Sequence, residues 1–171
     1  MAMFGALVVG ASLTVAGCTI APTQVARPSE AAPKPSPTNA AADTGDAQWV
    51  RANSLYAEAV CPTNAAREEL YEALDTNDIA QLAPVAASAS SAFDAAADVF
   101  LENSWPAEIE VDIHFLGETS AQLAESWGAV AASADMTAAN AVGFPDAQTP
   151  YEAAQRIRKT LDEHGQESAG C

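Results

Sequence analysis

The residues Glu108–Phe115 read EIEVDIHF and hold the highest density of chemically useful side chains in this sequence. Three carboxylates and one of only two histidines alternate strictly with apolar residues, a pattern typical of a half-buried β-strand. On a helix, by contrast, Glu110, His114 and Glu118 would lie four residues apart on one ridge, where two carboxylates and an imidazole can bind a divalent metal ion. Whether these residues lie on a strand or on a helix therefore decides whether they can form a metal site.

A longer pattern favours the helix. Apolar or small residues recur at steps of four and three well beyond the short alternation, at Ile109, Ile113, Leu116, Ser120, Leu123, Trp127 and Val130. This spacing places one stripe along a helix, and Trp105-Pro106 is a suitable helix start. No other stretch reads as a partner strand, and an isolated strand is not stable. We therefore expect Glu110, His114 and Glu118 to face water as an ordinary acidic surface; a metal site is the alternative, and no cofactor is expected.

The rest of the chain after residue 46 also reads as helix, because alanine abounds and β-branched residues rarely cluster. We expect one helix from Asp46, an interruption at Pro62 with a continuation capped by Thr63, a helix from Ile79 that is kinked at Pro84 or begins there, and a last helix from a cap at Thr149 to Gly165. The predicted fold is all-α, a single bundle of about four helices. Its expected core is Trp49, Phe93, Phe100, Ile109, Ile113, Leu116, Leu123, Trp127 and Ile157. Val111 and Phe115 point away from the main stripe, and core contact through another helix is expected to cover them; the linker or a partner protein is the alternative.

The N-terminal stretch MAMFGALVVGASLTVAGC has no charge from Phe4 to Gly17. This run is shorter than the roughly 20 apolar residues that span a membrane, and it suits the apolar part of an export signal. Its end, Val15-Ala16-Gly17-Cys18, resembles the lipobox of bacterial lipoproteins, although no Lys or Arg precedes the run. The resemblance implies cleavage before Cys18 and attachment of a diacylglycerol to its thiol. The alternative is an uncleaved anchor helix with a small buried cysteine.

The sequence then divides into a linker and a folded domain. Residues 1–17 are the expected signal peptide, and residues 18–46 are the lipidated cysteine and a disordered linker rich in Pro, Ala, Ser and Thr. Residues 47–171 are the expected helical bundle. They carry 20 acidic against 5 basic side chains, hence a formal charge of −15. A charge of this sign argues against nucleic acid or anionic lipid as a partner.

The remaining cysteines support an exported domain. With Cys18 assigned to lipidation, Cys61 and Cys171 form an even pair in an exported protein, which favours a disulfide. The bond would fasten the polar tail after Gly165 to the first helical region. Two free thiols that serve catalysis or metal binding are the alternative, but such sites usually need histidines nearby.

Motifs for catalysis are missing from the sequence. It contains no Gly-x-Ser-x-Gly, His-Glu-x-x-His, Gly-rich phosphate loop or Cys-x-x-Cys. His114 lies on an expected exposed face, and His164 lies in the expected fraying end of the last helix. We therefore expect that the protein is not an enzyme.

The folded part resembles small helical lipoproteins of unknown activity from high-GC Gram-positive bacteria. The resemblance rests on Cys61-Pro62 after the first helix, Trp105-Pro106 before a long helix, and Cys171. It implies a helical domain held at the extracytoplasmic face of the cell membrane by an N-terminal lipid, with no known reaction. We expect a non-catalytic module that binds an envelope protein or organises the cell surface. The alternative is a carrier of a small ligand or metal ion, for which Ser120 in the apolar stripe would be a polar core position.

Overall fold

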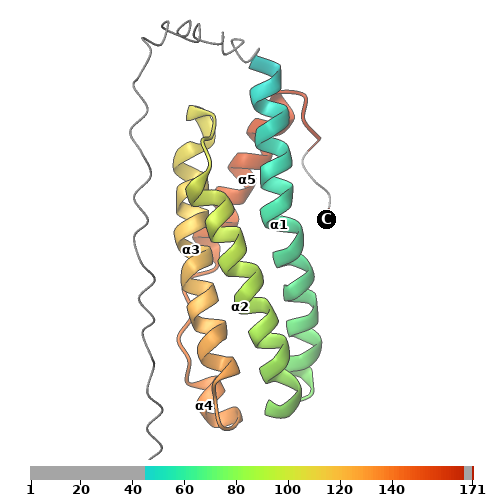
Figure 1. The fold of residues 1–171 in the computed structure, drawn as a ribbon, viewed down its shortest axis with the longest axis vertical. Coiled ribbons are helices and arrows are strands. Elements are labelled where there is room, and N and C mark those ends of the chain that lie inside the picture. Colours follow the sequence, from blue (N-terminus) through green and yellow to red (C-terminus); the bar gives the residue numbers. More distant parts are fainter. Residues whose placement is uncertain (1–44, 168–170) are drawn as a thin grey trace, which may run out of the picture. The chain divides into compact units, whose positions relative to one another are not determined.

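The computed structural model describes residues 45–167 and Cys171. The described residues form four long helices and one short one: α1 (Gly45–Asp75), α2 (Ile79–Glu102), α3 (Ala107–Ala131), α4 (Met136–Asn140) and α5 (Gln148–Glu163). The long helices pack as a bundle in which α1, α2 and α3 follow one another up and down (Figure 1). The predicted all-α bundle of about four helices is thus confirmed. The expected signal peptide, Cys18 and most of the linker lie outside the described residues. No helix among the described residues combines the length and the apolar character that a membrane crossing requires.

The expected interruption of α1 at Pro62 is wrong. The helix continues from Gly45 to Asp75 with Pro62 inside it, on an exposed position. A proline at this point removes one backbone donor, but the buried stripe of α1 continues on both sides of it. Thr63 caps no second helix; its hydroxyl donates to the carbonyl oxygens of Val60 at 2.9 Å and Ala59 at 3.4 Å. Continuous burial of one helix face therefore outweighs the lost hydrogen bond.

The predicted starts at Ile79 and after Trp105-Pro106 are confirmed for α2 and α3, whereas aspartates, and not the expected Thr149, accept the first-turn N–H groups of α2, α4 and α5. Asp78 and Asp135 each accept a backbone N–H bond at 2.9 Å in the first turns of α2 and α4. Pro84 therefore lies inside α2 and does not mark its start. The expected cap of α5 at Thr149 is wrong as well, because the carboxylate of Asp146 accepts both the backbone N–H of Thr149 at 3.0 Å and its hydroxyl at 2.8 Å.

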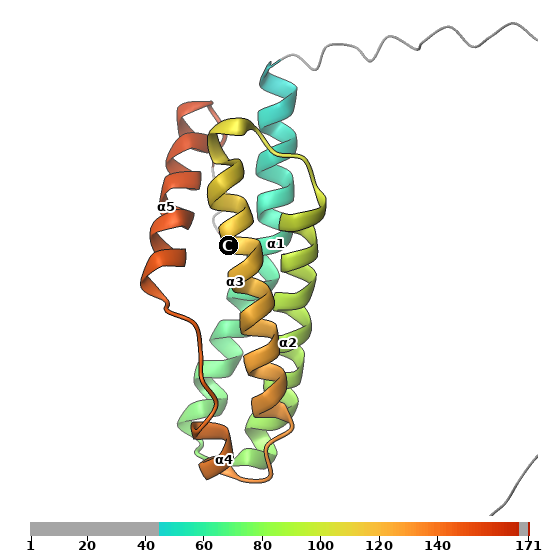
Figure 2. The same ribbon diagram turned by 90° about the vertical axis from the view of Figure 1, so that its left-hand side faces the viewer.

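The core has an aromatic part and an alanine-rich part. In the aromatic part α1, α2, α3 and α5 meet around Tyr56, Phe100, Trp105, Ile113 and Ile157. In the other part α1, α2 and α3 pack through several alanines together with Leu70, Leu82 and Phe93, and α4 adds Ala139. Figure 2 shows the reason for the division, since α5 lies beside only part of the length of α3. Seven of the nine expected core residues are buried, whereas Leu123 and Trp127 are half-buried in the part that α5 does not cover.

Helices α2 and α3 approach each other closely at Gly117. A Cβ atom at this position would lie 2.7 Å from Cγ and Cδ2 of Leu101 and 3.1 Å from Cβ of Phe100. Further along the same interface, the hydroxyl of Ser90 donates to the carbonyl oxygen of Ala124 at 2.7 Å. The small residues of α3 thus set the distance between the two helices.

We expect the substitution Gly117→Val to lower the free energy of unfolding by about 1–3 kcal/mol, the usual cost of overpacking. Leu101 is 39% exposed, so its truncation opens space at low cost. The loss of stability caused by Gly117→Val should therefore be smaller when Leu101 is replaced by alanine. Urea unfolding of the wild type, the two single variants and the double variant measures this difference as a coupling energy. An equal loss in both backgrounds would show that the contact with Leu101 does not limit the approach of the helices.

Candidate functional site

The three candidate metal ligands lie on the outer face of α3. The segment EIEVDIHF is helical, as predicted, and Glu110, His114 and Glu118 are all exposed. Across residues 45–167 and Cys171, no three His, Cys, Asp or Glu side chains lie close enough together to hold a metal ion. The described part of the chain therefore brings these residues together as a charged ridge and not as a metal centre.

The same helix exposes an apolar side chain that was expected to be covered. Val111 is 81% exposed, so the prediction of core contact is wrong for this residue. Phe115, one turn further along, is half-buried and packs against the aromatic core. Val111 and Phe115 thus form a second ridge of α3, which begins with an exposed valine and continues with a partly covered phenylalanine.

A groove of about 290 Å³ lies next to this ridge, between α3 and the segment that leads into α5. Its apolar surfaces come from Phe115, Pro145 and Pro150, and its two carboxylates are Glu118 and Asp146. The complete lining is Phe115, Glu118, Thr119, Gln122, Pro145, Asp146, Thr149 and Pro150. The groove therefore combines an apolar floor with negative charge at its rim.

Several contacts between α3 and the following segments fix the walls of the groove. The guanidinium of Arg156 donates to both carboxylate oxygens of Asp112, at 2.6 and 3.0 Å, and these hydrogen bonds raise the pKa of Arg156. The hydroxyl of Ser126 donates to the carbonyl oxygen of Gly143 at 2.9 Å. The hydrogen bonds from Thr149 lower the pKa of Asp146, so its carboxylate keeps its charge. The segment between α4 and α5, which forms one wall of the groove, is thus held against α3 by the Ser126–Gly143 hydrogen bond before it and by the Arg156–Asp112 pair after it.

A second polar feature lies between α1 and α5, at Tyr56, a residue that is absent from the expected core. The Tyr56 hydroxyl and the side-chain oxygen of Asn53 are buried, and no described residue provides a hydrogen-bond partner for either atom. Burial raises the pKa of Tyr56, and the nearby Arg158 guanidinium opposes that shift without reaching the geometry of a hydrogen bond. Arg158 also lines an open groove of about 560 Å³ on α5. In the sequence, the only signal for this feature was a tyrosine on the buried stripe.

The raised pKa of Tyr56 predicts a pH dependence of stability. A folded-state pKa above the unfolded value of about 10 means that folding favours the neutral hydroxyl; this contribution is present below about pH 10 and is lost as the pH rises through the folded pKa. The variant Tyr56→Phe should therefore lose less stability than the wild type between about pH 9 and pH 11.5. Urea unfolding at several pH values in this range gives the free energy of unfolding of both proteins as a function of pH. Identical slopes for the wild type and Tyr56→Phe would contradict the prediction.

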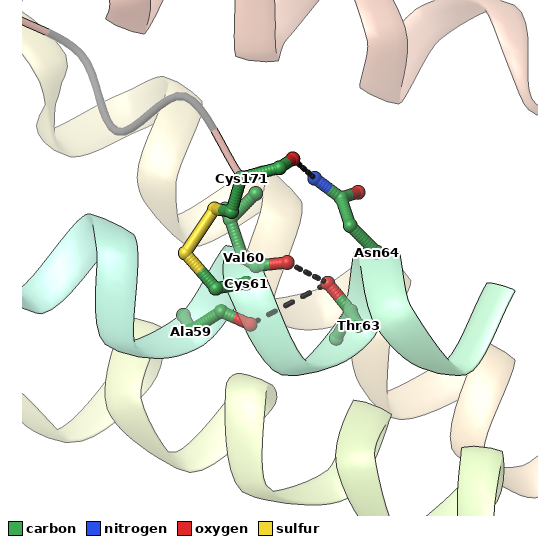
Figure 3. The surroundings of a disulfide bond; sticks show 6 residues. All are labelled: Ala59, Val60, Cys61, Thr63, Asn64 and Cys171. Atoms are coloured by element: carbon green, nitrogen blue, oxygen red, sulfur yellow. Dashed lines mark hydrogen bonds between the residues drawn. A yellow bond between two sulfur atoms is a disulfide. The ribbon is translucent and has the colours of Figure 1, made fainter. Parts of the chain in front are cut away.

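The predicted disulfide between Cys61 and Cys171 is confirmed, with the two Cα atoms 5.3 Å apart. Figure 3 shows that Cys171 also reaches the next turn of α1, where the amide nitrogen of Asn64 donates to its carbonyl oxygen at 3.3 Å. Three turns earlier on the same face of α1, the amide nitrogen of Asn53 donates to the carbonyl oxygen of Glu167 at 3.0 Å. The chain after α5 is thus fastened to α1 at two levels.

His164 does not lie in a fraying end, contrary to the expectation. Gly165 has a φ of 72°, and the N–H of Gln166 donates to the carbonyl oxygen of Leu161 at 3.0 Å, which is a Schellman C-cap. The ring of His164 stacks on Trp49 of α1, with ring centroids 3.7 Å apart and planes 11° apart. The end of α5 is therefore part of the packed structure.

Comparison with known proteins identifies no relative: no family model, curated protein or solved structure matches this chain. The resemblance to helical lipoproteins of high-GC Gram-positive bacteria thus stays a prediction from its own residues.

Proposed function

We propose that this protein is a lipid-anchored module at the extracytoplasmic face of the cell membrane, and that its helical domain binds another envelope protein without catalysing a reaction. The observation that carries the binding role is the groove between α3 and α5 with the exposed Val111 on the adjoining ridge. Exposed apolar surface that is rimmed by polar residues marks interaction sites in soluble domains.

The anchoring role rests on the sequence and on the disulfide. Val15-Ala16-Gly17-Cys18 resembles a lipobox, which implies a lipid on Cys18, and a structural disulfide suits an oxidising compartment outside the cytoplasm. The two features are independent of each other, and both point to export.

The substitution Cys18→Ala tests the anchor. We expect the wild-type chain to partition into the detergent phase of a two-phase detergent extraction of the producing cells, and the variant to move to the aqueous phase, because the acyl chains supply the affinity for the membrane. A variant that carries Cys61→Ala instead should still partition into detergent. Unchanged partition of the Cys18→Ala chain would refute the lipid anchor.

Crosslinking in the intact envelope tests the binding role. A photoreactive amino acid at position 111 should give one discrete crosslinked product, because this exposed position lies one helical turn before Phe115, which lines the groove. The same amino acid at Ala87, which is exposed on α2, is the matched control and should give none. Identical products from both positions, or none from position 111, would count against protein binding at this surface.

A carrier of a small ligand or metal ion is the second candidate. The unpartnered Tyr56 hydroxyl and Asn53 oxygen favour it, because a bound molecule could satisfy both atoms. Ser120 is buried in the stripe of α3, as expected. Native mass spectrometry of the chain purified from its own envelope separates the candidates: a discrete mass that leaves on denaturation supports the carrier, and a bare chain supports the protein-binding module.

A further inference from the structure

We propose that the groove between α3 and α5 takes up an arginine side chain from a positively charged segment of the partner. The inference rests on the proposed protein-binding function and adds the chemistry of what is bound. The charge, the shape and the side-chain composition of the groove favour arginine as the side chain that it binds.

The charge of the groove favours a cation. Glu118 is exposed at the rim and makes no ion pair with any other described residue. Asp146 is the second carboxylate, and its hydrogen bonds with Thr149 hold it in the charged form. The lining contains no lysine or arginine, and Arg156, further along α5, is already paired with Asp112. An incoming positive charge thus meets an unpaired carboxylate on a domain of charge −15, which also accelerates its approach.

The shape and the apolar surfaces favour arginine among the cations. A volume of about 290 Å³ is at or below the lower limit of pockets for drug-sized ligands, which begin near 300 Å³, so it suits one long side chain. Phe115 contributes an aromatic side chain to the lining, on which a planar guanidinium can stack, and Pro145 and Pro150 contribute apolar surface for its methylene stem. The ammonium of lysine is a compact, strongly hydrated charge that gains less from such a stacking surface.

The same charge argues against a second copy of this chain as the occupant. A two-fold symmetric pair would place the same surface patch of each copy against the other, and would bring Glu118 and Asp146 of both together. Like charges that face each other across an interface cost free energy. The groove is therefore matched to a basic partner and not to self-association.

Titration of the full, lipid-anchored chain in detergent micelles with short peptides tests the inference. The probes are acetyl-Gly-Pro-Arg-Pro-Gly-amide and the same peptide with citrulline or lysine at the centre, and NMR follows the backbone amides of Thr119 and Gln122. We expect the arginine peptide to bind about three- to tenfold more tightly than the citrulline peptide, which has the same shape without the charge. The lysine peptide should lie between them, and the difference should shrink at high salt.

Two variants separate the groove from the general charge of the domain. Glu118→Gln should weaken binding of the arginine peptide about two- to fivefold, whereas Glu125→Gln, at another exposed position on α3 that does not line the groove, should leave it unchanged. Equal weakening by both variants, or equal affinity for arginine and citrulline, would overturn the inference. If the photoreactive group at position 111 still captures a protein in that case, the proposed function stands and only the arginine anchor fails.

Discussion

Replacing both Cys61 and Cys171 by alanine is expected to lower the free energy of unfolding by about 2–5 kcal/mol. The two residues are 110 positions apart, so the bond restricts the unfolded chain over nearly the whole domain, and in the chain-entropy model a loop of about 100 residues is worth roughly 4.7 kcal/mol. The bond also holds Cys171 where Asn64 binds it. Its removal therefore acts on the unfolded chain and on the packing of the tail.

Urea unfolding of the oxidised wild type and of the double variant measures this loss. A reducing agent should destabilise the wild type to about the level of the double variant and should leave the double variant unaffected. The Cys18→Ala chain keeps the bond and serves as the control for cysteine replacement in general. A loss below about 1 kcal/mol, within reach of an ordinary point substitution, would mean that the tail contributes little to the stability of the bundle.

The substitution Ile157→Ala is expected to cost about 2–5 kcal/mol. Ile157 is completely buried, and together with Ala153 and Leu161 it forms the only fully buried stripe of α5 among the described residues. Truncation leaves a cavity where α5 meets α1, α2 and α3, and the fixed positions of the long helices allow little collapse into it. The last helix therefore depends on this one side chain more than on its surface ion pairs.

Tyr151→Ala is the matched control on the same helix, because its side chain is 60% exposed, and we expect it to change stability by no more than about 0.5 kcal/mol. Thermal or urea unfolding of the two variants gives the comparison directly. Comparable losses from both would contradict the arrangement in which the face of α5 around Ile157 packs into the core. Since the start of α5 forms a wall of the groove, Ile157→Ala should also weaken peptide binding there.

The sequence by itself determined the character of α3 and most of the core. The stripe from Ile109 to Val130 repeats at helical spacing over many turns, whereas the alternation in EIEVDIHF covers eight residues, and the longer pattern correctly predicted the helix. The cysteine pairing followed from an even number of cysteines in a domain that the sequence predicts to be exported. Both conclusions depend on properties of a single segment or on a count of residues, which folding does not alter.

Other features were decided only by the tertiary structure. Pro62 stays inside α1 because burial of the apolar stripe on both sides of it compensates for a lost hydrogen bond. The helix propensities of the residues around Pro62 do not include this gain from burial. Trp127 is half-buried because α5 is short and covers one part of α3 only. Val111 lies within the covered part, next to Asp112, but its side chain is on a side of α3 that no described element covers. The groove exists where the chain before α5 passes along α3. A periodic pattern identifies the face of a helix that needs a partner, but which helix covers that face, and how far, depends on contacts between residues that are distant in the sequence.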